Sequence, residues 1–204
     1  MFSMENQPVT QVRTQINVDL TNRDRQTVLL RVFLVFPPLI FLFTFSSNVN
    51  VGIFASVGGF LFFPALLALL FRGVYPSYCL AYNKAYLSLS NRVTAYLLLL
   101  TDQYPSIEES KVVTLSYPEI EDGKKLSRGM PLVKWFLAIP LYAVGIIYAI
   151  VAFVLTFVAW VNILMKGTYS EKTAEFVVNV VAYWNRVYGY AFMLITDEYP
   201  SFVL

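Results

Sequence analysis

Two aspartates, each followed two positions later by a tyrosine, are the side chains of this sequence whose types could support acid–base chemistry. Asp102 lies in the segment Thr-Asp-Gln-Tyr-Pro-Ser, and Asp197 lies in Thr-Asp-Glu-Tyr-Pro-Ser near the end of the chain. A carboxylate can transfer protons near neutral pH when burial or neighbouring charges shift its pKa. However, a proline after Tyr104 and Tyr199 and an aspartate before them are also typical of a turn that ends a helix. We interpret both segments mainly as helix ends whose tyrosines anchor at lipid headgroups.

An Asn-Arg pair precedes each aspartate, as Asn91-Arg92 in the first half and Asn185-Arg186 in the second, 94 positions apart. Each arginine can place its charge among phosphate headgroups while its aliphatic stem stays in apolar surroundings. Two alternatives stay open. One is a specific contact with an anionic lipid or a protein partner. The other is an ion pair with either aspartate, within one half or between the halves, which would fix how two helices lie against each other.

The composition argues against conventional catalysis. The chain has no histidine and a single cysteine, Cys79, so it lacks the commonest general base and the commonest metal ligand and cannot form an internal disulfide. It also lacks a phosphate-binding glycine loop, a nucleophile elbow and any cluster with metal-ligand spacing. A net charge of +2 without a basic cluster does not favour nucleic-acid binding. We therefore expect no enzymatic activity, no cofactor and no metal.

The two aspartate segments belong to a longer internal repeat. Upstream, the block "LLRVFLVFP" at residues 29–37 parallels "LVKWFLAIP" at 132–140, which aligns Arg31 with Lys134. The proline that ends each block is expected to kink its helix. The first half carries nine extra residues, which we place at 46–50. These matches favour a tandem duplication over a chance similarity between apolar segments.

Apolar residues make up 57% of the chain and charged residues 14%, and the apolar residues are concentrated in blocks, as is typical of polytopic membrane proteins. Residues 28–45 and 51–71 are each long enough to cross a bilayer. The second half has a 34-residue apolar run. As one helix it would be about 51 Å long, against a hydrocarbon core of roughly 30 Å. We therefore predict two spans there, at about 132–147 and 149–165, with a turn near 145–148.

The remaining segments of each half are predicted to be a strand and an amphipathic helix. Short alternating stretches with β-branched residues, at 15–20 and 111–117, are typical of strands. Residues 78–100 and 173–195 carry narrow polar stripes and most of the tyrosines, which favours helices lying in the membrane interface. The predicted fold class is an all-α integral membrane protein. It is a tandem repeat of a short strand, a transmembrane helical hairpin and an interfacial amphipathic helix, with four transmembrane helices.

Four segments follow from this repeat. Residues 1–24 form a polar N-terminal segment with a strand, 25–106 the first repeat, 107–130 a linker with a strand, and 131–204 the second repeat. Two spans in each half would place the basic residues of the termini and linker on one side of the membrane. By the positive-inside rule that side is the cytoplasm, so both termini are expected there.

The ordered motifs carry a resemblance to a known family. Both halves contain a basic-x-Phe-Leu-x-x-Pro block, a basic-Gly-x-Tyr turn (72–75 and 166–169), Asn-Arg-Val-x-x-Tyr and Thr-Asp-x-Tyr-Pro-Ser. This order resembles the bacterial membrane family called domain of unknown function 4389. The match is closer for residues 115–202, since the first half has Pro37-Pro38 and a longer connection. The resemblance implies a multi-pass protein of the bacterial cytoplasmic (inner) membrane, and it supplies no activity and no site residues.

We weigh three non-enzymatic functions. The first is an accessory or scaffold subunit of a larger membrane protein complex. The alternative is a lipid-binding or membrane-shaping protein that acts through two amphipathic helices on the cytoplasmic face. A transporter would need charges within its spans, and the four predicted spans place none at mid-span. Expected partners are membrane lipids and other membrane subunits, and a homo-oligomer is possible. The candidate lipid or partner contacts are Arg92, Arg186, Asn91, Asn185, Asp102, Asp197, Tyr104, Tyr199, Trp160 and Trp184.

Overall fold

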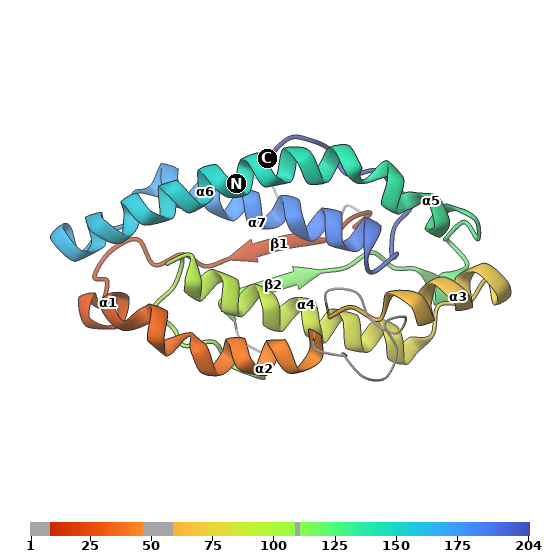
Figure 1. The fold of residues 1–204 in the computed structure, drawn as a ribbon, viewed down its shortest axis with the longest axis horizontal. Coiled ribbons are helices and arrows are strands. Elements are labelled where there is room, and N and C mark those ends of the chain that lie inside the picture. The colour runs from red at the N-terminus through yellow and green to blue at the C-terminus, as the bar shows by residue number, and fades with distance from the viewer. Residues whose placement is uncertain (1–8, 47–58, 109–110) are drawn as a thin grey trace.

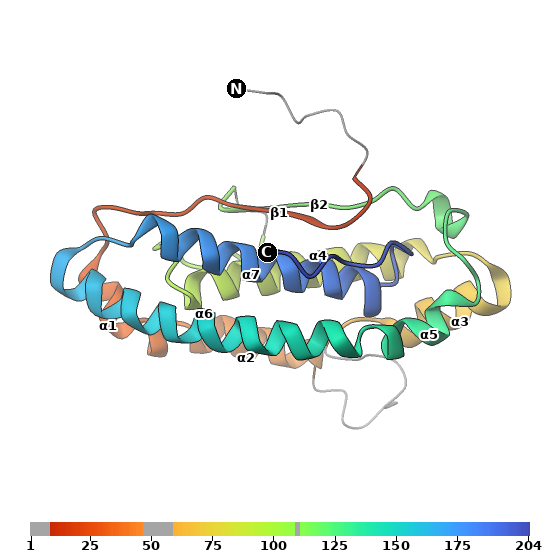
Figure 2. The ribbon, with the colours of Figure 1, turned by 90° about the horizontal axis from the view of Figure 1, so that it is seen from above.

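The computed structural model describes residues 9–46, 59–108 and 111–204, and it places them in three layers that share one long axis (Figures 1 and 2). A ribbon of two strands forms the first layer, two amphipathic helices form the second, and apolar helices form the third. The strands are β1 (Arg13–Ile16) and β2 (Val113–Ser116), and the helices are α1 (Arg25–Leu34), α2 (Phe36–Ser46), α3 (Phe62–Arg72), α4 (Ser77–Leu97), α5 (Met130–Leu137), α6 (Ile139–Lys166) and α7 (Glu171–Ala191), with a 3-10 turn at Glu121–Gly123.

The two predicted strands are confirmed, and they pair with each other. β1 and β2 are antiparallel, with Arg13 opposite Ser116 and Ile16 opposite Val113. The first strand begins two residues before the predicted segment 15–20. β1 contacts α7 and β2 contacts α4, so the ribbon covers the pair of amphipathic helices on the side away from the apolar layer (Figure 2).

The predicted turn near 145–148 is wrong. The apolar run of the second half forms α5 and then one continuous 28-residue helix, α6, which passes through this region and ends at Lys166. Gly145 lies within α6 and does not mark a turn. A Cβ at this position would lie only 2.8 Å from the ring of Trp184. The glycine therefore permits α6 and α7 to approach closely. Hydropathy identified the apolar run correctly, but it did not show where the run is divided. The break falls at Ala138, between α5 and α6, and not near 145–148.

The first half shows the same departure from a hairpin of two spans. α1, α2 and α3 follow one another along the long axis, from red to yellow in Figure 1. The nine extra residues placed at 46–50, and part of the predicted span 51–71, lie outside the described residues. In the part of the chain that is described, two helical segments are long and apolar enough to cross a membrane. They are Arg25–Phe45, which combines α1 and most of α2, and Ile139–Lys166, which is α6. The four predicted spans are therefore not supported.

The apolar helices turn back at two glycines. Gly73 ends α3 with φ 62° and Gly167 ends α6 with φ 71°. Both values lie in the left-handed region, which glycine adopts without the steric cost that other residues meet. After each glycine the chain returns along the molecule as an amphipathic helix, α4 or α7. Each helical hairpin therefore joins one apolar helix to one amphipathic helix.

Prolines interrupt the apolar helices where the sequence predicted a kink. α1 ends at Leu34 and α2 begins at Phe36, just before Pro37-Pro38. α5 ends at Leu137 and α6 begins one residue before Pro140. A proline has no N–H group and crowds the preceding turn, so it is tolerated at the start of a helix and breaks a longer one.

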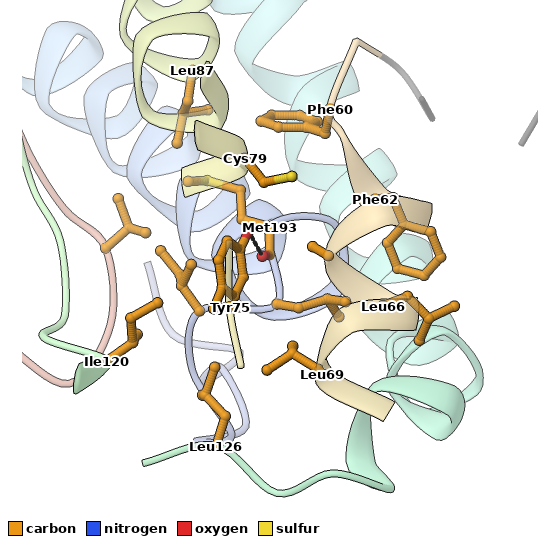
Figure 3. Close-up of a cluster of buried hydrophobic side chains, with 14 residues drawn as sticks. Phe60, Phe62, Leu66, Leu69, Tyr75, Cys79, Leu87, Ile120, Leu126 and Met193 are labelled. Atoms are coloured by element: carbon orange, nitrogen blue, oxygen red, sulfur yellow. Dashed lines mark hydrogen bonds between the residues drawn. The ribbon is translucent and has the colours of Figure 1, made fainter. Parts of the chain in front are cut away.

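The predicted amphipathic helices exist, although α4 and α7 end three and four residues before the predicted boundaries. They run antiparallel between the ribbon and the apolar layer (Figures 1 and 2). A buried cluster at one end joins the two halves (Figure 3). There α3 packs against the start of α4, and the hydroxyl of Tyr75 donates to the carbonyl oxygen of Met193 at 2.6 Å.

Candidate functional site

The carboxylate of Asp102 pairs with two arginines that lie far before it in the chain. Arg31, on α1, places one guanidinium nitrogen on Asp102 and a second on the carbonyl oxygens of Tyr96 (2.9 Å) and Thr101 (3.0 Å). Its guanidinium carbon lies 4.3 Å from the centre of the Tyr96 ring. Arg23 donates two hydrogen bonds to the same carboxylate, at 2.9 and 2.6 Å. Both arginine side chains are buried, with exposures of 3% for Arg31 and 0% for Arg23.

Asp197 repeats this arrangement with a lysine. The ammonium group of Lys134, on α5, lies 2.7 Å from Asp197 and donates to the carbonyl oxygen of Thr196 at 2.7 Å. The ammonium nitrogen is 5.3 Å from the centre of the Tyr190 ring. The backbone N–H of Ser127 donates to the other carboxylate oxygen at 2.6 Å. In each half, therefore, a basic residue of an apolar helix meets a tyrosine ring and the aspartate of the repeated segment.

Two leucines in the left-handed region bring the aspartates to these positions. Leu99 follows α4 with φ 63°, and Leu194 follows α7 with φ 58°. This conformation costs a residue with a side chain roughly 1–2 kcal/mol. Both leucines are almost fully buried, at 3% and 0% exposure, and burial of their side chains offsets that cost. The turn directs each Thr-Asp pair back toward the apolar helices.

Both aspartates are held in the charged form. Burial acts to raise the pKa of Asp102, but hydrogen bonds from Arg23 and the Asp24 N–H, together with the nearby positive charges, outweigh it and lower this pKa below its ordinary value. For Asp197, burial again acts upward, and hydrogen bonds from Lys134 and the Ser127 N–H lower the pKa overall. A carboxylate with a lowered pKa is a weak base at neutral pH. The geometry therefore favours a structural role for both over proton transfer.

The alternative in which the aspartates pair with Arg92 or Arg186 is wrong, since Asp102 pairs with Arg23 and Arg31 and Asp197 pairs with Lys134. Arg92 donates to the carbonyl oxygen of Ser106 at 2.8 Å and to the hydroxyl of Ser88 at 2.9 Å. Arg186 donates to the carbonyl oxygen of Val203. Both arginines bind the segment that follows their own helix, whereas the leucine turns direct the aspartates toward α1 and α5.

The sequence did contain a signal for the true partners. Arg31 and Lys134 are the lone charges of residues 29–45 and 130–165, and they occupy aligned positions. A charge inside an apolar block needs an opposite charge or several hydrogen bonds. The repeated aspartates were the natural candidates. Arg23, in contrast, has no repeated pattern that would have identified it.

The two asparagines of the Asn-Arg pairs meet across the contact between α4 and α7. The amide nitrogen of Asn91 donates to the amide oxygen of Asn185 at 2.9 Å, and the reverse bond measures 2.7 Å. Both residues are buried, at 3% and 1% exposure. Asn185 also donates to the hydroxyl of Thr14 in β1 at 2.8 Å. One amide pair therefore connects both halves and the ribbon.

The other candidate contacts have separate positions. Trp160 donates to the carbonyl oxygen of Val28 at 3.2 Å, and Trp184 packs against Gly145 and Tyr188. Both tryptophans therefore have contacts within the chain, but each is only half-buried, so a contact with a partner stays a prediction. Tyr104 is half exposed and packs its ring edge-on against Tyr96. Tyr199 donates from its hydroxyl to the carbonyl oxygen of Leu137 at 3.0 Å.

Many large apolar side chains of the apolar layer are exposed, and together we call them the apolar face. It is formed by exposed side chains of α1, α2, α5 and α6, together with two residues of α3. Arg31 and Lys134, the only charged residues of 29–45 and 130–165, are both buried beneath it. Its large exposed side chains are Leu29, Leu30, Val32, Phe33, Leu34, Phe36, Ile40, Phe43, Leu67, Phe71, Leu132, Val133, Trp135, Phe136, Leu137, Ile139, Ile146, Ile147, Ile150, Val151, Phe153, Val154, Phe157, Val158, Val161 and Met165.

The comparison with known families concerns the second half. Residues 130–203 match the family described as domain of unknown function DUF4389. The matched region holds α5, α6, α7 and the closing Thr-Asp-Glu-Tyr-Pro-Ser segment, so the predicted resemblance is confirmed there. One copy of this family is found, where the sequence had suggested two. No curated protein and no solved structure matches significantly.

The ion pairs generate a prediction about stability. Asp197→Asn should destabilise the fold more than Lys134→Met, because it leaves a fully buried ammonium group without its counter-ion. We expect losses of about 3–5 kcal/mol when one partner of such a pair is removed. Denaturant unfolding of the protein in detergent micelles measures this. As a control, Lys125→Met disrupts the exposed Lys125–Glu121 pair and should change little. The interpretation fails if all three variants unfold alike.

The same pairs predict how stability depends on pH. The pKa values of Asp102 and Asp197 are lowered by folding, so their stabilising contribution is complete above the unfolded-state pKa of about 4. It is lost as the pH falls through the lower folded-state pKa. Thermal unfolding midpoints should therefore be level from about pH 7 to 5 and fall below about pH 4. Lys134→Met removes a cause of the shift at Asp197, so its acid slope should be shallower. An acid slope equal to that of the unchanged protein would contradict the assignment.

The asparagine pair generates a third prediction. Asn91→Leu or Asn185→Leu alone leaves the other amide buried without its partner and should cost about 1–3 kcal/mol. The double variant removes both polar groups and should cost less than the sum, with a coupling energy of about 0.5–3 kcal/mol. Denaturant unfolding of the four proteins in the cycle measures this coupling. Additive losses would mean that the two amides do not bind each other.

Proposed function

We propose that this chain is a non-enzymatic membrane protein that lies within one leaflet of a bilayer and shapes it. The observation that carries the proposal is the apolar face. Within residues 29–45 and 130–165 no charged side chain is exposed, whereas the ribbon on the opposite side of the molecule exposes Arg13, Gln15, Thr114 and Ser116. An apolar surface this wide on one side only is typical of a surface that contacts lipid or a partner.

The apolar helices are too exposed to be the core of a soluble domain. Only 28% of the most apolar window of Arg25–Phe45, and 17% of that of Ile139–Lys166, is buried within the chain. A core helix is buried on most of its sides. Two helices of this length and composition therefore support association with a membrane.

An in-plane orientation fits better than a crossing one. α6 has 28 residues, which gives about 42 Å of helix against a hydrocarbon core of roughly 30 Å. The ribbon, α4 and α7 all run along the same axis (Figures 1 and 2). If α6 crossed the bilayer, the open edges of β1 and β2 would enter hydrocarbon, where each unpaired backbone group costs several kcal/mol. With the long axis in the membrane plane, the ribbon stays in water.

The side chains of α6 favour lipid over a protein partner. Helices that pack on one another inside a membrane use small residues at the contact. On α6 the small residues Gly145, Ala152 and Ala159 are buried against the rest of the chain. Its exposed positions carry bulky Ile, Val and Phe side chains. The accessory-subunit function, in which partner helices would cover this face, is therefore the second candidate.

Shaping follows from the position in one leaflet. Helices that insert at the acyl boundary displace lipids of that leaflet alone, and membrane binding of this kind is sensitive to curvature. We further propose that the leaflet is the cytoplasmic one of a bacterial inner membrane. There, exposed basic residues at the two ends of the molecule's long axis would contact anionic lipid. Arg25 and Lys166 lie at one end, and Lys124, Lys125 and Arg128 lie in the connection at the other.

We also propose that the two halves arose by tandem duplication. Supporting this are the equivalent cation–tyrosine–aspartate groups, the glycines that end α3 and α6, and the left-handed leucines after α4 and α7. An approximate two-fold axis through the Asn91–Asn185 pair would relate the halves. In an in-plane molecule that axis stands along the membrane normal, so both halves present the same side to the lipid.

A depth measurement tests the orientation. In a Cys79→Ala background, spin labels replace Ile146, Phe153 and Met165 along α6, and Gln15 in the ribbon. After reconstitution into vesicles, the three α6 labels should lie at similar depth in one leaflet, because an in-plane helix is level, and the Gln15 label should be accessible to water. A depth maximum at Phe153 with both other positions near headgroups would establish a crossing helix instead.

A vesicle assay tests the function. Added to large vesicles of mixed phosphatidylcholine and phosphatidylglycerol, the protein should produce tubules or smaller vesicles in electron micrographs. The pair Ile150→Asp and Phe153→Asp, on the apolar face, should abolish this. The pair Gln15→Asp and Ser116→Asp makes the same charge change on the ribbon and should not. Unchanged vesicles with the native protein, together with co-purification of a stoichiometric membrane subunit, would favour the accessory-subunit function.

A further inference from the structure

An open groove of about 1300 Å³ lies between α2, α4 and the chain around β2. One wall comes from the apolar layer, where Phe41 and Phe45 of α2 line the groove. The other comes from the polar side of the molecule, where Lys111 precedes β2. α4 forms the floor between them, so the groove extends from the apolar layer to the aqueous side.

The chemistry of the groove changes along this direction. Near α2 it is aromatic, since the ring of Phe45 lies 6.1 Å from that of Tyr82. Toward β2 it is cationic, because Lys84, Arg92 and Lys111 all line it. Among the described lining residues, Glu108 is the only acidic one. An aromatic wall at the depth of acyl chains and a cationic one at the depth of headgroups match a lipid molecule in both polarity and orientation.

Two of the three cations have no carboxylate partner among the described residues. Lys84 and Lys111 form no ion pair there, and the ammonium nitrogen of Lys84 lies 5.0 Å from the centre of the Tyr117 ring. Arg92 is fixed at the edge of the groove by its bonds to Ser106 and Ser88. An anion between the two lysines would receive charge-assisted hydrogen bonds from both.

The second half repeats Arg92 as Arg186 but has no equivalent of Lys84. At the position aligned with Lys84 stands Val178, which packs among partly buried apolar residues. Along the same helix, Arg186 donates to the carbonyl oxygen of Val203 in the closing segment. The pair of Lys84 and Lys111 at this groove therefore does not follow from the shared architecture alone.

We propose that this groove holds one anionic phospholipid of the contacted leaflet. Its acyl chain lies along Phe41 and Phe45, and its phosphate lies between Lys84 and Lys111. This inference rests on the proposed membrane function, because the groove meets lipid only if the apolar face does. It adds a specific, stoichiometric lipid to a surface that otherwise contacts bulk lipid.

Native mass spectrometry of the full chain tests the site. Protein reconstituted in equal amounts of phosphatidylcholine and phosphatidylglycerol is released from the bilayer, and the retained lipid is counted. We expect one phosphatidylglycerol per chain. The pair Lys84→Gln and Lys111→Gln should lower its retention at least tenfold. The control pair Lys124→Gln and Lys125→Gln makes the same charge change outside the groove and should retain the lipid.

A second variant tests whether the lipid lies in the groove itself, without changing the charge of the groove. Ala85 lines the groove and is exposed, so Ala85→Trp should fill the space without disturbing the core. It should lose the lipid while Lys84 and Lys111 are intact. Retention of phosphatidylcholine equal to that of phosphatidylglycerol would overturn the proposal, as would displacement of the lipid by millimolar inorganic phosphate. Retention by Ala85→Trp would exclude the groove as the site.

The depth measurement on α6 keeps the two proposals distinct. If the native protein lies in one leaflet but retains no phosphatidylglycerol, the groove proposal is wrong and the membrane function stands. If the α6 labels do not enter the bilayer at all, the membrane function itself is wrong. Capture of a protein segment in the groove in place of lipid would also overturn the groove proposal.

Discussion

The arrangement of the layers depends on the cost of burying a cation without a partner. Arg31 and Lys134 project from apolar helices into the interior, where an uncompensated charge would cost several kcal/mol. Each finds one aspartate, and that aspartate stands just after the amphipathic helix of the same half. The apolar helices are thereby held against the ends of α4 and α7. With these two charges satisfied internally, the exposed side chains of residues 29–45 and 130–165 include no charged group.

Local features of the fold could be predicted from the sequence, and its path in space could not. Alternation gave the two strands, prolines gave the breaks before α2 and α6, and the polar stripes gave α4 and α7. The error in α6 has a physical origin. Hydropathy reports how apolar a run is, but not whether the run crosses a bilayer or lies along it. α6 continues through the predicted turn, and Gly145 there lets α7 pack closely against it, a contact that hydropathy does not report.

The sequence identified several residues of the candidate site, but it identified few of the contacts that they make. Asn91 and Asn185 were selected because they repeat, and they bind each other. The aspartates were also selected, but with the wrong cations. The turns that direct the aspartates toward their partners contain Leu99 and Leu194 at φ 63° and 58°. Leucine rarely adopts this conformation, so the sequence does not predict these turns. The contacts of the tryptophans within the chain could not be predicted, because they join residues distant in sequence, such as Trp160 and Val28.

The reciprocal amide pair has a consequence for how such a chain could have begun. Asn91 and Asn185 each donate to and accept from the other, and so would two identical residues facing one another across a dyad. β1 and β2 likewise complete each other as antiparallel partners. A polypeptide with a single unit would therefore leave one amide and one strand edge unpaired. Association with a second copy of itself would satisfy both. Under the proposed duplication, an isologous homodimer of half-length chains would therefore be the precursor of this single chain.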